Sequence, residues 1–127
     1  MLVPAYTRKT RQKEAIRAAF TEAGRPLSPD EVLRMTRSSV DSMSIATIYR
    51  NISSLMADGW LTSVDIPGEP ARYELSGKDH HHHFHCNHCG KVFEIEGCVA
   101  AALPPVPKGF ELTGHEFFLY GKCVACS

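Results

Sequence analysis

Two pairs of cysteines with the spacing Cys-x-x-Cys constrain the fold of this chain more than any other feature. The first pair is Cys86 and Cys89, and the second pair is Cys123 and Cys126. Two such pairs typically close a tetrahedral zinc site, in which the metal keeps four thiolates deprotonated. Because residues 90–122 separate the pairs, a longer gap than a zinc ribbon has, we expect a folded sheet to bring them together. The alternative, a thioredoxin-like redox pair, needs only one such motif, and neither pair follows a βαβ pattern.

The composition indicates a globular protein with room for one domain of usual size or two small ones. The chain has 127 residues, of which 43% are hydrophobic and 22% are charged. It has neither an apolar run of about 18 residues nor a charged and then apolar leader, so we expect a cytoplasmic protein with no membrane partner. In such a protein, five cysteines indicate metal or redox chemistry rather than a disulfide framework.

Helical spacing of apolar residues dominates the first sixty residues. Gly24 ends the first predicted helix, and Ser28 with Glu31 gives the second a capping-box start. The third predicted helix starts at Ser44. The apolar faces that we expect in the core are Ile16, Ala19 and Phe20; Val32, Leu33 and Met35; and Ile48, Ile52, Leu55 and Met56.

After Trp60 the apolar period changes to two. Residues 61–66 and 71–75 flank a Pro-Gly turn, which predicts a hairpin directly behind the third helix. Three helices followed by a hairpin are the order of a winged helix-turn-helix domain. We expect residues of the third helix that point away from its core face to reach DNA bases and phosphates, and a basic stretch in residues 8–17 either to contact phosphates or to be a solvated helix face. The candidate DNA-binding residues are Arg11, Thr47, Tyr49 and Arg50.

The second half, from about residue 80, has strand-like runs in residues 91–97 and 110–122. Residues 98–109 between them read as a one-turn helix ended by prolines. A unit of this size buries little apolar surface by itself and needs a metal or a partner chain.

Six of the seven histidines lie between Asp79 and Cys89. If this run is extended, side chains alternate, so that His80 and His82 point to one face and His81 and His83 to the other. Two metal sites can therefore share one strand. An expression tag is disfavoured because the run is internal, and a polar loop is disfavoured because such loops contain Gly, Ser, Asn and Asp. The remaining candidate ligands are Glu74, Glu94, Cys98 and His115.

Three stretches of the chain resemble the ferric uptake regulator family, whose members sense iron, zinc, manganese or peroxide. They are "ATIYRNISSLMADGWL", "ARYELSGKDHHHHFHCNHCGKVFEIEG" and "LTGHEFFLYGKCVAC". The resemblance implies an α+β protein with an N-terminal winged helix-turn-helix DNA-binding domain in residues 1–78. It implies a small α/β dimerisation domain with zinc sites in residues 79–127, and a hinge metal that sets the angle between the domains.

Carried over residue by residue, the resemblance implies three metal sites. The structural zinc site uses Cys86, Cys89, Cys123 and Cys126. The regulatory hinge site uses Glu74, His81, His83 and Glu94. An additional site uses His80, His82 and His115, and Cys98 falls at the place of a family glutamate. Cys98 is either a fourth ligand, which suits tetrahedral zinc, or a small buried hydrophobic residue.

The resemblance also has departures that bear on the metal. Iron and peroxide sensors usually add a histidine just before the second helix, where this chain has Pro26. We therefore expect a homodimeric, zinc-responsive repressor that binds palindromic operator DNA and controls metal uptake genes. Zn²⁺ is the expected regulatory metal, with Fe²⁺ or Mn²⁺ as the other options, and an iron- or peroxide-responsive regulator is the alternative function. A zinc hydrolase would need an open metal position, a general base and a supporting motif that the chain lacks, so we expect no enzyme.

Overall fold

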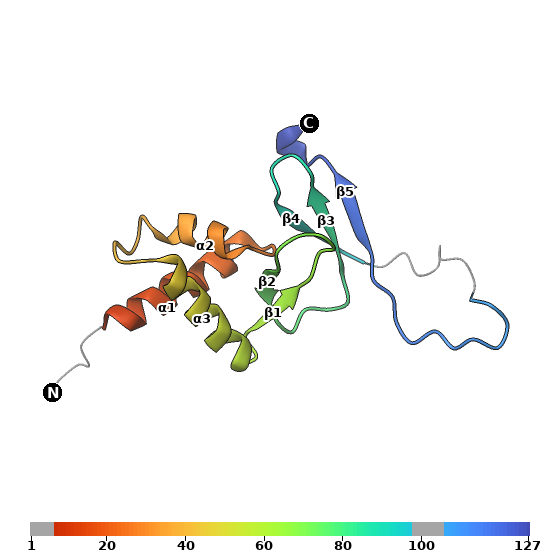
Figure 1. Cartoon of the computed structure of the whole chain (residues 1–127), viewed down its shortest axis with the longest axis horizontal. Coiled ribbons are helices and arrows are strands. Elements are labelled where there is room, and N and C mark those ends of the chain that lie inside the picture. Colours follow the sequence, from red (N-terminus) through yellow and green to blue (C-terminus); the bar gives the residue numbers. More distant parts are fainter. Residues whose placement is uncertain (1–6, 98–105) are drawn as a thin grey trace. The chain divides into compact units, whose positions relative to one another are not determined.

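The computed structural model describes residues 7–97 and 106–127 and divides the chain into two compact units. The first unit runs to Gly77, and the second begins at Lys78. Figure 1 shows that helices gather in the first unit and that each unit has its own sheet. The two units are therefore described in turn.

The helices of the first unit begin and end where the local sequence supplies capping groups. They are α1 (Arg8–Ala23), α2 (Pro29–Thr36) and α3 (Ile45–Ala57). The side chains of Thr7, Ser28 and Ser44 each accept a hydrogen bond from a backbone N–H in the first turn. The predicted capping box of Ser28 and Glu31 is formed, and Gly24 ends α1 with a left-handed φ of 61°. No helix in the described ranges is both long and apolar enough to cross a membrane.

The core of the first unit lies between the three helices. Seven predicted core residues are buried there, namely Ile16, Ala19, Phe20, Val32, Ile48, Ile52 and Leu55. The prediction was wrong for Met35 and Met56, each of which is 38% exposed. The buried residues of α2 are Pro29, Glu31, Val32 and Thr36, and Met35 is not among them although it follows Val32 by about one turn. The spacing of apolar residues on so short a helix therefore did not identify which side chains the core covers.

A hairpin follows α3, as predicted. Strand β1 (Leu61–Val64) pairs antiparallel with β2 (Arg72–Leu75). Leu27, in the segment before α2, exchanges backbone hydrogen bonds of 2.8 and 2.9 Å with Tyr73 of β2. This pairing ties the hairpin to the helices, and the order of elements is that of a winged helix.

The second unit contains a sheet with the strand order β4-β3-β5 (Figure 1). The strands are β3 (His82–Cys86), β4 (Val92–Ile95) and β5 (Phe118–Gly121), and a short 3₁₀ helix, η2 (Val124–Cys126), follows β5. The central strand β3 is antiparallel to β4 and parallel to β5.

The prediction of a strand throughout residues 110–122 was wrong for residues 110–117, which form no strand. Phe118 pairs with His83, close to the start of β3, so a longer β5 would have little partner strand to pair with. Most of the one-turn helix predicted for residues 98–109 lies outside the described residues. Residues 106–109 are not helical.

Replacing Ser28 by alanine removes the side chain that accepts a 3.2 Å hydrogen bond from the Glu31 N–H. We expect the free energy of unfolding of the first unit to fall by about 1 kcal/mol. Trp60, the single tryptophan of the chain, lies in this unit, so its fluorescence in a urea titration reports the change. Ser38→Ala, at an exposed position beyond α2, is the control, and equal midpoints for the two variants would contradict a stabilising capping box.

Candidate metal centres

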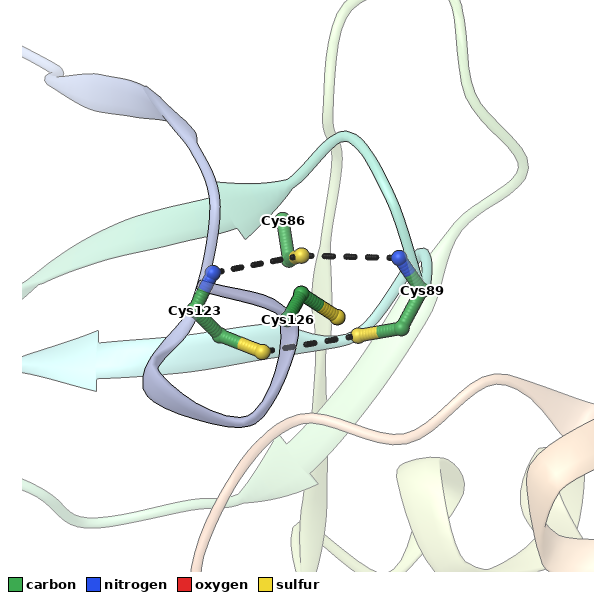
Figure 2. A group of neighbouring side chains, drawn as sticks. All are labelled: Cys86, Cys89, Cys123 and Cys126. Carbon is green, nitrogen blue, oxygen red and sulfur yellow. Dashed lines mark hydrogen bonds between the residues drawn. The ribbon is translucent and has the colours of Figure 1, made fainter.

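The two cysteine pairs converge because β3 and β5 are parallel neighbours that end at the same side of the sheet. Cys86 at the end of β3 pairs in register with Gly121 at the end of β5, and Cys123 follows two residues later. All four Sγ atoms lie within 4.8 Å of one another, as Figure 2 illustrates. The Sγ atoms of Cys89 and Cys123 are 3.8 Å apart. A tetrahedral site with Zn–S bonds of about 2.3 Å has sulfur–sulfur edges of about 3.8 Å, so the cluster fits a zinc ion.

Hydrogen bonds within this cluster stabilise one thiolate and disfavour another. The backbone N–H of Cys89, 3.4 Å from the Cys86 sulfur, is the main cause that lowers the pKa of Cys86 to about 5, and the N–H of Cys123 at 3.3 Å adds to it. Hydrogen bonding to Cys123, followed by burial, raises the pKa of Cys126 to about 12. The protein alone therefore stabilises one negative charge well but not four. A divalent cation would supply the missing positive charge.

The even-numbered histidines form a second group of donors with His115. The Nε2 atom of His80 lies 3.1 Å from the Nε2 atoms of both His82 and His115. Burial lowers the pKa of His82, and the neighbouring imidazoles lower it further, which favours the neutral form that binds metals. Zinc–nitrogen bonds of about 2.0–2.1 Å require donor separations of about 3.4 Å, which is close to this spacing. Cys98, the predicted fourth member, lies outside the described residues.

The odd-numbered histidines, His81 just before β3 and His83 within it, form a third group. The rings of His81 and His83 have centroids 4.8 Å apart. Glu94 of β4 pairs in register with His83, and its Oε1 atom is 3.9 Å from the Nε2 atom of His81. Three of the four predicted hinge ligands thus meet within the second unit. Glu74, the fourth, is buried on β2 of the first unit.

Lys78 is a residue of this region that the sequence analysis missed. Its Nζ atom forms an ion pair with the Oε1 atom of Glu94. The pairing depends on how β4 lies beside β3, and no local motif around the lysine indicates it. In the sequence, the only indication of a role for Lys78 was its position close to the histidine run.

The candidate DNA-binding residues differ in exposure. Tyr49 on α3 is 52% exposed, and Arg50 on α3 and Arg11 on α1 are exposed as well. The expectation that Thr47 is exposed was wrong, since it is only 6% exposed. Its hydroxyl oxygen accepts a 3.1 Å hydrogen bond from the guanidinium of Arg50 and lies 3.0 Å from the hydroxyl of Ser44. Thr47 therefore orients Arg50 and helps to close the first turn of α3.

Comparison with known proteins gives a consistent family likeness. Residues 5–120 match the model of the ferric uptake regulator family. The ferric uptake regulation protein of Campylobacter jejuni is 32% identical over 123 residues, which cover 93% of this chain and 78% of that protein.

Solved structures share the fold. The Helicobacter pylori ferric uptake regulator, whose structure reveals three functional metal binding sites, has a TM-score of 0.65 at 25% identity, over 91% of this chain and 79% of that chain. A zinc-bound manganese uptake regulator has a TM-score of 0.76 at 24% identity, over 91% of this chain and 89% of that chain, and this likeness concerns the fold alone. These likenesses confirm the predicted α+β fold class.

We predict that Cys86→Ser or Cys123→Ser removes one zinc ion per chain and unfolds or monomerises the second unit. A structural zinc ion contributes folding free energy on the order of 10 kcal/mol in small zinc domains. Metal analysis and sedimentation of the purified protein measure both effects. His88→Ala is a matched control because His88 is exposed between Cys86 and Cys89 and belongs to none of the donor groups formed by the described residues. Full zinc content and an unchanged dimer in both serine variants would refute the four-cysteine site.

Proposed function

This chain belongs to the ferric uptake regulator family, and from that premise we propose that it is a zinc-responsive repressor of metal uptake genes. It is a transcriptional regulator and not an enzyme. We further propose that it acts in the cytoplasm as a homodimer on palindromic operator DNA, with residues 1–78 binding DNA and residues 79–127 forming the dimer. The observation that carries the proposal is the convergence of His81, His83 and Glu94 close to the point where the first unit ends.

The proposed regulatory mechanism uses a metal ion held by residues of both units. Glu74 would supply a ligand from the first unit, and His81, His83 and Glu94 would supply ligands from the second. Such an ion can favour the DNA-binding arrangement only by having a higher affinity for it than for other arrangements. By the same linkage, operator DNA would increase the affinity of the protein for the metal.

Zn²⁺ is the proposed regulatory metal because of the donor types. Imidazole nitrogens and carboxylates in a small set suit zinc, and the position at which iron and peroxide sensors usually add a histidine is Pro26, which is buried. The second candidate function is iron-responsive regulation, favoured by the name of the C. jejuni relative. Mn²⁺ is a further option for the same site.

We also propose two further zinc sites in the second unit. The four-cysteine cluster would hold a structural zinc, for which the 3.8 Å separation of two sulfurs is support. The group of His80, His82 and His115 would hold an additional ion, with Cys98 as its fourth ligand. If Cys98 is instead a core residue, water would complete that site.

DNA recognition is assigned to the exposed side of α3. Since the net charge of the chain is zero, attraction to DNA must come from local groups such as Arg50 and Arg11 rather than from an overall positive charge. Tyr49 and Arg50 stand at the start of α3, the part of a recognition helix that contacts base edges.

We predict that Tyr49→Ala or Arg50→Ala weakens operator binding by at least about 1–3 kcal/mol and leaves the metal content intact. Fluorescence anisotropy at fixed salt, on an operator selected from random DNA, measures the loss. Lys108→Ala is the control, since it removes one exposed positive charge from the other unit. Wild-type affinity in both α3 variants would exclude α3 as the recognition helix.

Substitution of an odd-numbered histidine, His81 or His83, should have a different effect from substitution of His80 or His82. His81→Ala or His83→Ala should abolish zinc-dependent operator binding in a protein that remains a folded dimer, because only the hinge ion couples the units. His80→Ala or His82→Ala should lower zinc stoichiometry and stability with a smaller effect on the zinc response. Operator titrations over a buffered zinc series, together with metal counting, measure both effects.

His88→Ala serves again as the control for loss of an imidazole. Equal behaviour of the odd and even variants would contradict the assignment of two sites.

The variant Cys98→Ala tests the role of that cysteine, because it should remove about one zinc ion per chain if Cys98 is one of four ligands. Retention of every zinc ion would place Cys98 in the core.

A further inference from the structure

We propose that the ammonium group of Lys78 competes with the regulatory metal ion for Glu94 and thereby sets the concentration of free metal that loads the hinge site. This inference rests on the proposed hinge site. It concerns a residue outside the ligand set, and it assigns that residue a role in metal affinity.

The same carboxylate oxygen of Glu94 pairs with Lys78 and lies near His81. The Oε1 atom of Glu94 forms an ion pair with the Nζ atom of Lys78, and the same oxygen lies 3.9 Å from the Nε2 atom of His81. A metal ion bound by His81 and Glu94 would occupy the space beside this oxygen. The ammonium of Lys78 is paired with this same oxygen, so it would compete with a metal ion that binds the oxygen.

Burial strengthens the competition. The side chain of Lys78 is 25% exposed and that of Glu94 is 23% exposed, so solvent screens this pair less than a pair on the open surface. A divalent ion and an ammonium group within a few ångströms also repel each other strongly. Metal binding therefore requires that Lys78 first leaves the carboxylate.

The size of the effect follows from the fraction of molecules in which Glu94 is free. The apparent dissociation constant equals the intrinsic constant divided by that fraction. For a partly buried pair, the free fraction is between about a third and a tenth, which weakens metal binding about 3- to 10-fold.

The test is a titration of full-length Lys78→Met with Zn²⁺ against a chromophoric chelator. The protein keeps its four-cysteine zinc and carries His115→Ala, which removes a ligand of the other histidine group. We expect the dissociation constant of the remaining site to fall about 3- to 10-fold. Lys78→Arg keeps a cation near Glu94 and should retain the original value. Lys108→Met is the matched control for the loss of one exposed positive charge in the same unit.

Glu94→Gln separates failure of this inference from failure of the hinge site. It should weaken zinc binding, and Lys78→Met should no longer tighten binding when combined with it. If Glu94→Gln weakens binding but Lys78→Met leaves it unchanged or weaker, the competition is refuted and the hinge site stands. If Glu94→Gln binds zinc as tightly as the parent, the hinge assignment fails and the role of Lys78 fails with it.

Discussion

The second unit depends on how the charges of four converging cysteine sulfurs are balanced. In its described part, the buried apolar residues are Cys86, Val92 and Cys123, and two of these three contribute sulfur atoms to the cluster. So thin a core stabilises a sheet only weakly. The proposed zinc ion would do what a larger core does elsewhere, by joining the ends of β3 and β5. In this proposal, the parallel register of β3 and β5, and with it the placement of both histidine groups, would depend on the same ion.

The central strand β3 contributes His82 to one donor group and His83 to the other because its side chains alternate, and His80 and His81 precede it. A shift of its pairing by one residue would exchange the faces on which His82 and His83 lie. Neighbouring strands on both edges of β3 prevent such a shift. The side chain of Phe84 also restricts it, since its ring lies where Gly121 of β5 has no Cβ atom, with only 3.1 Å available for one. The register of the sheet thus determines which histidines share a face.

Local patterns in the sequence predicted the parts of the fold and site that are encoded within a few residues. The capping box at Ser28, the two cysteine pairs and the alternation of the histidine run are of this kind. Features set by contacts between distant segments were not predictable. The exposure of Met35 depends on which side of α2 meets the core, the length of β5 depends on the length of β3, and the ion pair of Lys78 depends on the position of β4.

The parallel pairing of β3 and β5 has a consequence for how such a protein can diversify. Antiparallel β4 follows β3 through a short turn, but a strand parallel to β3 must be reached by a long connection. Residues 96–117 provide that connection, and they include Cys98 and His115. The entropic cost of closing a loop rises only slowly with its length. Related proteins can therefore differ in the length and the residues of this segment while the sheet and the cysteine cluster stay unchanged. The proposed ligands in this segment can therefore change without a change in the fold.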